Sequence, residues 1–313
     1  MANDVQVQPG AITGDLPAVK TETAGKRESM RSVYRAAWIF AAPGIIVFIL
    51  FAWYPLIMGF VSAFQSYEAV NYAPFVGWEN FKAILSDSIT YVTFRNTLEY
   101  TILSIVLTFL VPIIVAILLM EMSPRIIRIM MILWYIPVSS LAGMIIWKWI
   151  YNKDYGLLNA ILAALGLPQL GWLNDPRLTM IALILPGLIM YGPGLIYVAS
   201  LQSIPSSLYE AADLEGASVW QKMRYITLPR LRPIIAMTLV LSTIGNMSVF
   251  ENVLVMTGGG PANRTRTVVM YIYQLAFEYW QYGRATALAI MLFLVIGILI
   301  LLQRRYFREN IDV

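Results

Sequence analysis

Residues 210–233 are Glu-Ala-Ala-Asp-Leu-Glu-Gly-Ala-Ser-Val-Trp-Gln-Lys-Met-Arg-Tyr-Ile-Thr-Leu-Pro-Arg-Leu-Arg-Pro, a polar and patterned segment between two long apolar stretches. Just before it, Ser207 stands three residues ahead of Glu210, which is the spacing of a capping box. In that motif the hydroxyl and the carboxylate each satisfy one free amide at a helix start. Gly216 follows, and glycine readily takes the left-handed backbone that ends a helix. The pattern predicts a short helix that ends at a glycine.

A second short helix is predicted after this glycine. Ser218 and Gln221 repeat the capping-box spacing. Pro229 and Pro233 are expected to bound this helix on its far side, because proline cannot donate the backbone hydrogen bond that continues a helix. Residues 204–232 therefore form, by prediction, two short helices joined at a glycine elbow.

Composition places the rest of the chain in a membrane. Hydrophobic residues make up 59% of it, charged residues 13%, and the mean hydropathy is +0.68, far from the values of soluble domains. Six apolar stretches reach the length, roughly 20 residues, that a helix needs to cross a bilayer. They lie at about residues 36–64, 99–120, 127–150, 179–201, 233–256 and 285–303. We predict an all-α polytopic membrane domain over residues 31–313, preceded by a disordered tail at residues 1–30.

Basic residues predict the orientation of this domain, because lysine and arginine are retained on the cytoplasmic side of membranes. With the N-terminus inside, most of the 22 basic residues fall in cytoplasmic segments. Both termini and the segment 204–232 are therefore predicted to be cytoplasmic, where ATP is available.

Several functions are disfavoured by what the chain lacks. It has no cysteine and no histidine, which removes the commonest metal ligands and general bases. Three glycines at 258–260 are not followed by the Gly-Lys-Ser/Thr of a phosphate loop, so no nucleotide site is predicted. The net charge of +4 lies at helix ends beside lipid headgroups, which argues against nucleic acid as a partner. We predict no enzyme activity, no metal site and no cofactor bound by this chain.

The polar segment resembles the EAA loop of the membrane permeases of ATP-binding-cassette (ABC) importers. The matching residues are Glu210, Ala211, Ala212, Gly216, Ile226 and Pro229. In that family the loop is cytoplasmic, and its first helix docks into a groove on an ATPase subunit. The resemblance implies an ATPase-coupling site formed by Tyr209, Glu210, Ala211, Ala212, Glu215, Gly216 and Ala217. Glu215 departs from the aspartate that is more common there but keeps its charge.

A second resemblance narrows the family. Thr257-Gly-Gly-Gly-Pro-Ala-Asn263, with Tyr271-Ile-Tyr-Gln274 and Ala276-Phe277, is similar to the region before the last helix of maltose-type and glycerol-phosphate-type sugar permeases. Two outer-loop segments, 75–81 and 155–159, also resemble carbohydrate importers. The first could instead be an aromatic belt at the membrane surface. The resemblance implies the type I ABC importer permease fold in a bacterial or archaeal cell membrane.

The same resemblance implies the partners of the chain. They are a second permease, two ABC ATPase subunits that bind ATP and Mg, and an extracytoplasmic solute-binding protein. The solute would be a sugar or oligosaccharide, and lipid would surround the helices.

Candidate solute-contacting residues lie in the fourth and fifth predicted crossings. Ser242, Asn246 and Phe250 recur every four residues and would share one helical face, offering hydroxyl, amide and aromatic groups to a sugar. By resemblance, Ser242 and Asn246 match polar positions that the maltose-type permease uses for its solute. Ser and Asn could instead bond to neighbouring helices. Tyr191 and Gly192 begin a Tyr-Gly-Pro-Gly break near midplane depth, which suits a solute site or a gating kink.

Two other classes of protein remain as alternatives. An ion-coupled secondary transporter would explain the polar groups in membrane helices but has no need of the EAA pattern. Only Glu251 could be its coupling carboxylate. Glu251 could also contact the solute, but we expect a structural ion pair there with Arg264, Arg266 or a partner subunit. An intramembrane enzyme is disfavoured by the missing histidine and by the absence of a Gly-x-Ser-x-Gly arrangement.

Overall fold

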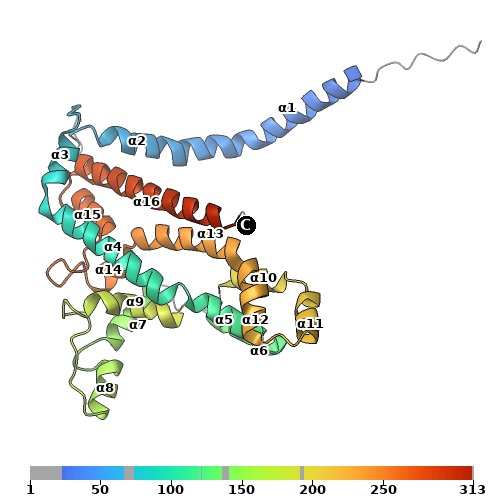
Figure 1. The fold of residues 1–313 in the computed structure, drawn as a ribbon. Helices are drawn as coiled ribbons and strands as arrows, with labels where there is room; N and C mark the ends of the chain where they lie inside the picture. The colour runs from blue at the N-terminus through green and yellow to red at the C-terminus, as the bar shows by residue number, and fades with distance from the viewer. Residues whose placement is uncertain (1–22, 67–73, 121, 136–140, 191–193, 312–313) are drawn as a thin grey trace, which may run out of the picture. The chain divides into compact units, whose positions relative to one another are not determined.

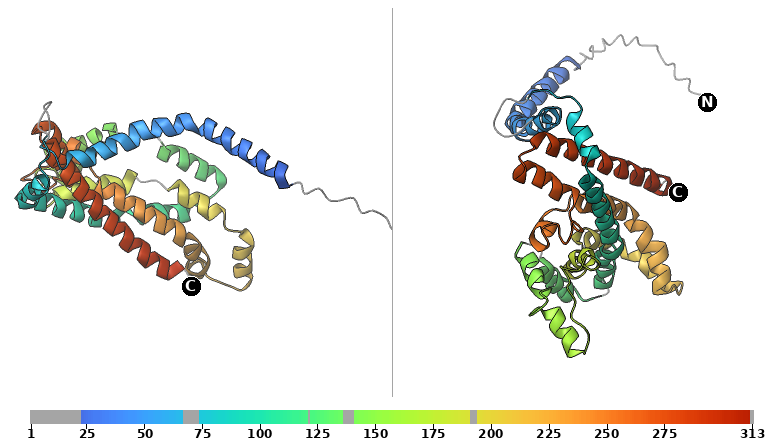
Figure 2. Two further views of the ribbon diagram at one scale, coloured as in Figure 1. Left: turned by 90° about the horizontal axis from the view of Figure 1, so that it is seen from above. Right: turned by 90° about the vertical axis from the view of Figure 1, so that its left-hand side faces the viewer.

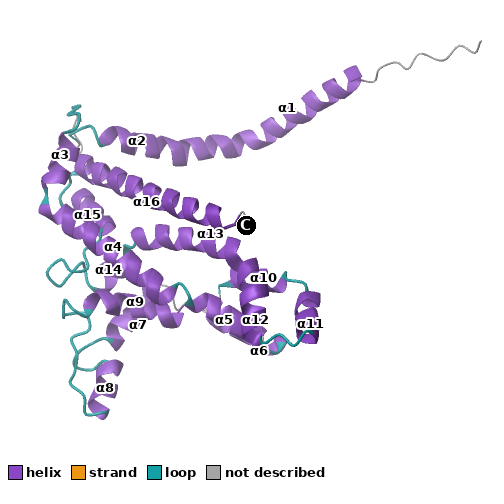
Figure 3. Cartoon of the chain, viewed as in Figure 1, coloured by secondary structure: helices purple, strands orange, loops and turns teal. Residues whose placement is uncertain are grey.

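The computed structural model describes residues 23–66, 74–120, 122–135, 141–190 and 194–311. Helices dominate these residues, and within the described ranges the only β pairing is an isolated bridge between Gln65 and Phe75 (Figure 3). The all-α prediction is therefore confirmed.

The helices, with three π-helical turns labelled η, follow one another along the chain. In order they are α1 (Thr23–Phe48), η1 (Ile49–Trp53), α2 (Tyr54–Ser62), α3 (Glu79–Ser86), α4 (Ser88–Thr108), α5 (Val111–Met120), α6 (Pro124–Tyr135), α7 (Leu141–Ile150), α8 (Leu157–Ala164), α9 (Thr179–Met190), α10 (Leu195–Gln202), α11 (Ser206–Leu214), α12 (Val219–Lys222), η2 (Met223–Thr227), α13 (Leu228–Met247), α14 (Glu251–Met256), α15 (Val268–Tyr273), η3 (Gln274–Glu278) and α16 (Tyr282–Ile311).

The chain divides into two compact units, residues 1–58 and residues 59–313. The first contains α1, η1 and the start of α2. Helix α1 begins at Thr23, inside the segment predicted to be a disordered tail, because residues 23–30 are rich in Ala, Lys, Arg, Glu and Met, which favour helix. The tail prediction is therefore wrong for residues 23–30 and stays a prediction for residues 1–22.

The second unit is built on α13, which packs against both α4 and α16 (Figures 1 and 2). One buried apolar cluster joins α16 to α15 and the end of α13 through Leu288, Val268 and Met247. A second cluster surrounds α9 and α14, and a third lies where α5, α10 and α13 meet. These clusters hold residues 204–232 at one end of α13 and the turn at residues 257–267 at the other end.

Four helical segments among the described residues are long and apolar enough to cross a membrane: Val33–Ser62, Ser88–Met120, Val219–Met247 and Tyr282–Phe307. They correspond to the first, second, fifth and sixth predicted crossings. The third and fourth are divided between α6 and α7 and between α9 and α10, with residues 136–140 and 191–193 outside the described ranges. The count of six stays a prediction.

The second crossing begins at Ser88, eleven residues before the predicted start at residue 99. The added turns carry a buried polar face that hydropathy does not detect. Its threonines bond to the preceding turn: Thr97 and Thr101 Oγ1 donate to the carbonyls four residues back at 2.8 and 2.7 Å. Because the helix satisfies these hydroxyls itself, they can be buried against neighbouring helices.

The fifth crossing also differs from the predicted residues 233–256. It begins at Val219, runs through η2 and ends at Met247, where Ser248 is the C-cap. Pro229 and Pro233 therefore do not bound the helix, and that prediction is wrong. Pro229 lies in the first turn of α13, after a π turn, where a missing amide hydrogen costs little.

The segment between α2 and α3 is held against the start of α16. Asn80 Nδ2 donates to the Ala63 and Gln65 carbonyls, both at 2.9 Å. Gly283 of α16 lies directly on this pair: a Cβ there would come within 2.3 Å of the Gln65 carbonyl oxygen and 2.7 Å of Asn80 Nδ2. Only glycine fits at this contact.

We therefore predict that Gly283→Ala lowers the stability of the protein by about 1–3 kcal/mol, the range for overpacking a close contact. The measurement is the thermal unfolding midpoint of the purified protein in mild detergent. Gly297→Ala is the control, because a Cβ at Gly297, in the same helix, meets nothing within 4 Å. Equal midpoints for the two variants would contradict the close contact.

Candidate functional site

The predicted glycine elbow is present between α11 and α12. Gly216 has φ of +73°, in the left-handed region. Two hydrogen bonds close the end of α11: Ala217 N donates to the Ala212 carbonyl at 2.9 Å, and Gly216 N donates to the Asp213 carbonyl at 3.1 Å. This pair is the Schellman arrangement that ends many helices.

Only one of the two predicted capping boxes forms. At the start of α12, Gln221 N donates to Ser218 Oγ and Ser218 N donates to Gln221 Oε1, at 3.4 and 2.7 Å. The predicted box of Ser207 and Glu210 is wrong. The N-cap of α11 is Pro205, without a side-chain hydrogen bond, so Ser207 already lies inside the first turn.

Two contacts hold α11 against α12 and η2. Tyr209 Oη lies 2.9 Å from Thr227 Oγ1, and Lys222 Nζ forms an ion pair with Asp213 Oδ1 at 2.7 Å. The ion pair is solvent-accessible and contributes at most about 1 kcal/mol. Together with the elbow, these contacts fix the angle between the two short helices.

The seven predicted coupling residues divide between two faces of this pair of helices. Glu210, Ala211, Glu215 and Gly216 are exposed, whereas Tyr209, Ala212 and Ala217 are half-buried. Beside the exposed group stand two apolar side chains that sequence reasoning left out: Leu214 is 91% exposed and Trp220 75% exposed. Apolar surface of this kind marks a contact with another protein or with the membrane.

Ser242 and Asn246 are half-buried on α13, one turn apart. Within the described part of the chain neither side chain has a hydrogen-bond partner, and both are available to a ligand. Thr243, the next position round the helix, is buried and accepts a hydrogen bond from Gln303 Nε2 of α16 at 2.7 Å. Helix α16 therefore covers the face of α13 that carries Thr243. It does not cover the positions of Ser242 and Asn246.

Phe250 does not share this helical face, and that prediction is wrong. Helix α13 ends at Met247, and Phe250 is the N-cap of α14 with φ of −138°. Its ring packs against Tyr273 with centroids 5.1 Å apart. A periodicity of four assumed a continuous helix, whereas the chain turns between α13 and α14. Tyr191 and Gly192 lie outside the described residues.

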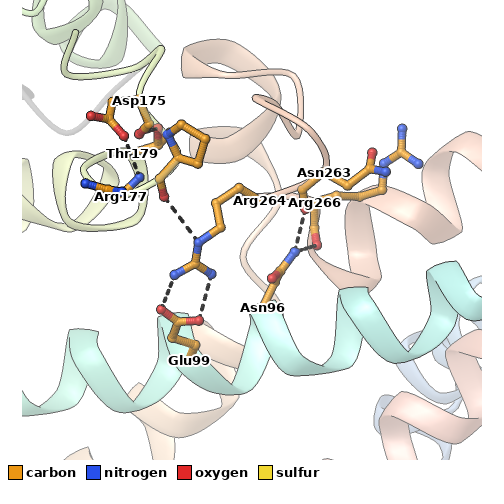
Figure 4. Close-up of polar contacts among 9 residues, drawn as sticks. Asn96, Glu99, Asp175, Arg177, Thr179, Asn263, Arg264 and Arg266 are labelled. Carbon is orange, nitrogen blue, oxygen red and sulfur yellow. Dashed lines mark hydrogen bonds and ion pairs between the residues drawn. The ribbon is translucent and has the colours of Figure 1, made fainter.

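At the opposite end of α13, the outer turn at residues 257–267 is tied to α4 (Figure 4). The Arg264 guanidinium makes a two-pronged ion pair with the Glu99 carboxylate, and its Nε donates to the Pro176 carbonyl at 3.3 Å. The hydrogen bond to Glu99 raises the pKa of Arg264. Arg264 is therefore not the partner of Glu251, which is in neither of the two ion pairs found among the described residues. An ion pair of Glu251 with a partner subunit stays a prediction.

Asn96, one turn before Glu99, completes this attachment. Its Nδ2 donates to the Asn263 and Arg266 carbonyls at 2.6 and 3.0 Å (Figure 4). Sequence reasoning missed Asn96 because the predicted crossing began at residue 99, and it missed Glu99 because its partner Arg264 is 165 residues away along the chain. The polar positions at three- and four-residue intervals from Thr93 to Ser104 were the available signal.

The glycine run in the turn at residues 257–267 allows the backbone to reverse: Gly258 and Gly259 have φ of +61° and +88°. A metal site is not indicated, since the described ranges contain no group of three or more acidic side chains placed to hold an ion.

Comparison with known proteins identifies the family. Residues 125–311 match the model of the family described as binding-protein-dependent transport system inner membrane component. The arabinooligosaccharides transport system permease AraP of Bacillus subtilis is 33% identical over 90% of this chain and 91% of its own length. The trehalose/maltose transport system permease MalF of Thermococcus litoralis is 31% identical over 84% of this chain and 91% of its own.

A solved structure agrees with these relatives. A permease chain of a bacterial ABC transporter involved in the import of the acidic polysaccharide alginate superposes with a TM-score of 0.78 at 25% identity, covering 90% of this chain and 99% of its own. The comparisons do not favour the ion-coupled secondary transporter. Proteins of this family are transport components and not themselves enzymes. This multi-pass membrane chain therefore belongs to the binding-protein-dependent transport system inner membrane component family, the permease subunits of ABC importers.

Proposed function

We propose that this chain and a second permease form the translocation pathway for a sugar or oligosaccharide. Two ABC ATPase subunits, which bind ATP and Mg, drive transport, and an extracytoplasmic solute-binding protein delivers the solute. The complex lies in a bacterial or archaeal cell membrane with both termini of this chain in the cytoplasm. The names of relatives support a saccharide solute, because they include arabinooligosaccharide, trehalose/maltose and alginate systems.

The observation that carries this proposal is the continuity of the helix from the polar segment into the membrane. Val219–Met247 is one helical segment of 29 residues, made of α12, η2 and α13. Trp220 is near its cytoplasmic start and Asn246 near its end, roughly 40 Å apart at about 1.5 Å per residue. A push on α11 and α12 by an ATPase subunit would therefore move the solute-facing residues directly.

The coupling residues are proposed to act in two groups. Glu210, Ala211 and Glu215, with Leu214 and Trp220, form the exposed face that an ATPase subunit would contact. The half-buried Tyr209, Ala212 and Ala217, with the elbow at Gly216, transmit that contact to α12 and η2. Leu214 and Trp220 would be the anchors, since large apolar side chains that become buried contribute most to an interface.

Ser242 and Asn246 are proposed to contact the solute. A sugar presents hydroxyls that both donate and accept hydrogen bonds, and the serine hydroxyl and asparagine amide offer both functions. Tyr191 and Gly192 stay proposed contacts from the fourth crossing, and Phe250 stays a proposed aromatic contact from the turn after α13.

The first experiment is purification of the chain from its native membrane in mild detergent, with an ATPase assay of the recovered complex. Recovery of a second permease and of ATPase subunits is the expected result. A chain that purifies alone and transports solute under an ion gradient would overturn the proposal.

We predict that Leu214→Asp weakens the association of the ATPase subunits by about 2 kcal/mol, or roughly thirtyfold, because it puts a charge into a contact that must lose water. Uptake into proteoliposomes should fall accordingly, while the protein still inserts. The measurement is ATPase co-purification together with uptake. Ser206→Asp, on an exposed position of the same helix about 80° round the axis from Leu214, is the control and should change neither quantity.

The glycine elbow generates a related prediction. Gly216→Pro cannot adopt φ of +73°. Ala212→Trp would put a large side chain on the half-buried side of α11 and displace that helix. Both variants should insert normally but lose most of their uptake. Normal uptake with normal ATPase activity in both would exclude a coupling role for the elbow.

Asn246→Ala should raise the KM for uptake about fivefold through loss of one hydrogen bond of about 1 kcal/mol, with ATPase assembly intact. Asn252→Ala is the matched control. Asn252 Nδ2 donates to the Leu183 carbonyl at 2.9 Å, so its loss should lower thermal stability and leave the KM unchanged. An unchanged KM in Asn246→Ala would remove this residue from the solute site.

A further inference from the structure

The outer ends of α7 and α14 enclose a cavity of about 420 Å³ that none of the proposed transport residues touches. Its walls come from three segments: the residues after α7, the turn at residues 171–174, and the glycine turn after α14. The volume lies within the range of about 300–1,000 Å³ typical of small-molecule sites. The residues that decide its chemistry are Lys148, Tyr151, Asn152, Lys153, Trp172 and Thr257.

Tyr151 is the most unusual group in this wall. Its side chain is only 2% exposed, and its hydroxyl has no hydrogen-bond partner in the described part of the chain. The ring is held between Trp147 and Trp172, with centroids 5.5 and 5.8 Å away. A buried hydroxyl without a partner destabilises the free protein, so it is retained where something else supplies the partner.

Hydrogen bonds also fix the walls of the cavity. Asn159, 1% exposed, holds the loop that forms one wall: its Nδ2 donates to the Lys153 and Leu170 carbonyls at 3.1 and 2.9 Å. Its Oδ1 accepts from Trp172 Nε1 at 3.1 Å, which fixes the orientation of the indole ring. A wall whose aromatic and polar groups are held in place before binding loses little entropy when a ligand arrives.

Lys148 fixes the opposite wall. Its Nζ donates to the Val255 carbonyl at 3.0 Å and so joins α7 to the end of α14. Lys153 stands on the exposed rim beside Asp154. Two lysines and one aspartate leave the cavity weakly positive. Asn152 adds an amide nitrogen, since its oxygen accepts from Asp154 N at 2.9 Å. The Thr257 hydroxyl is bonded to the Val253 carbonyl and to Thr265 Oγ1, at 3.0 and 2.8 Å.

We propose that this cavity is a second saccharide-binding site, at the outer mouth of the permease and separate from Ser242 and Asn246. The indole of Trp172 offers a flat apolar surface to a sugar ring. The Tyr151 hydroxyl and the Asn152 amide nitrogen offer hydrogen bonds to ring hydroxyls, and the lysines favour a sugar that carries a carboxylate. This inference rests on the proposed function, since it assigns a further contact for the same class of solute.

The test measures binding of two trisaccharides to the assembled importer complex in nanodiscs by saturation-transfer difference NMR, without the solute-binding protein. The probes are maltotriose, which is neutral, and trigalacturonate, which is acidic. We expect at least one to bind, and Tyr151→Phe to weaken that binding about fivefold, the loss for one hydrogen bond. Preference for trigalacturonate would assign the lysines a role in recognising the carboxylate.

Two control variants make the result specific. Tyr155→Phe removes a hydroxyl from an exposed tyrosine of the same loop that does not line the cavity, and it should leave binding unchanged. Asn246→Ala should keep the Tyr151-dependent signal, because that signal arises outside the transport pathway.

Three results would overturn the inference. The first is absence of binding for both probes, and the second is binding that Tyr151→Phe does not weaken. The third is a Tyr151→Phe variant that loses affinity for the solute-binding protein but not for either sugar, which would assign the cavity to protein docking. In each case, sugar uptake by the unmodified complex in proteoliposomes would show that the proposed function still holds.

Discussion

A peptide group inside a bilayer has no water to bond, so each backbone amide and carbonyl there must find its partner within the protein. Side chains of α4 meet that constraint at several positions among the described residues. The Thr97 and Thr101 hydroxyls bond back to their own helix, and the side chain of Asn96 satisfies the carbonyls of Asn263 and Arg266 in the outer turn. The polar residues of α4 therefore stabilise the fold, although they lower its hydropathy.

The same constraint makes α13 a suitable element for transmitting force. A helix whose backbone hydrogen bonds are internal can move as a rod, while the elements at its two ends are fastened by side chains. At one end Tyr209 and Lys222 tie α11 to η2 and α12, and at the other end Arg264 holds the turn at residues 257–267 to α4 and to the Pro176 carbonyl. Movement of α13 is thus expected to be resisted at defined hydrogen bonds.

The sequence was informative where one local pattern determines local structure. The glycine elbow and the box of Ser218 and Gln221 both depend on neighbouring residues, and both were predicted. The failures came from contacts made at a distance. Hydropathy could not show that polar turns before residue 99 are helical, because their burial depends on other helices. Four-residue spacing could not show that the chain turns before Phe250. The partner of Arg264 is 165 residues away along the chain, so no local pattern indicates Glu99.

The π turn at Met223–Thr227 sets the rotational phase of everything that follows it. An α-helix advances about 100° per residue, and a π turn holds one residue more than an α turn. Each side chain of α13 is therefore rotated by about that angle from where an unbroken α-helix through α12 would place it. Thr243 faces α16 and Ser242 and Asn246 face away only in this phase. The five residues of η2 thus determine which stripe of α13 lies against α16, without contributing a side chain to that contact.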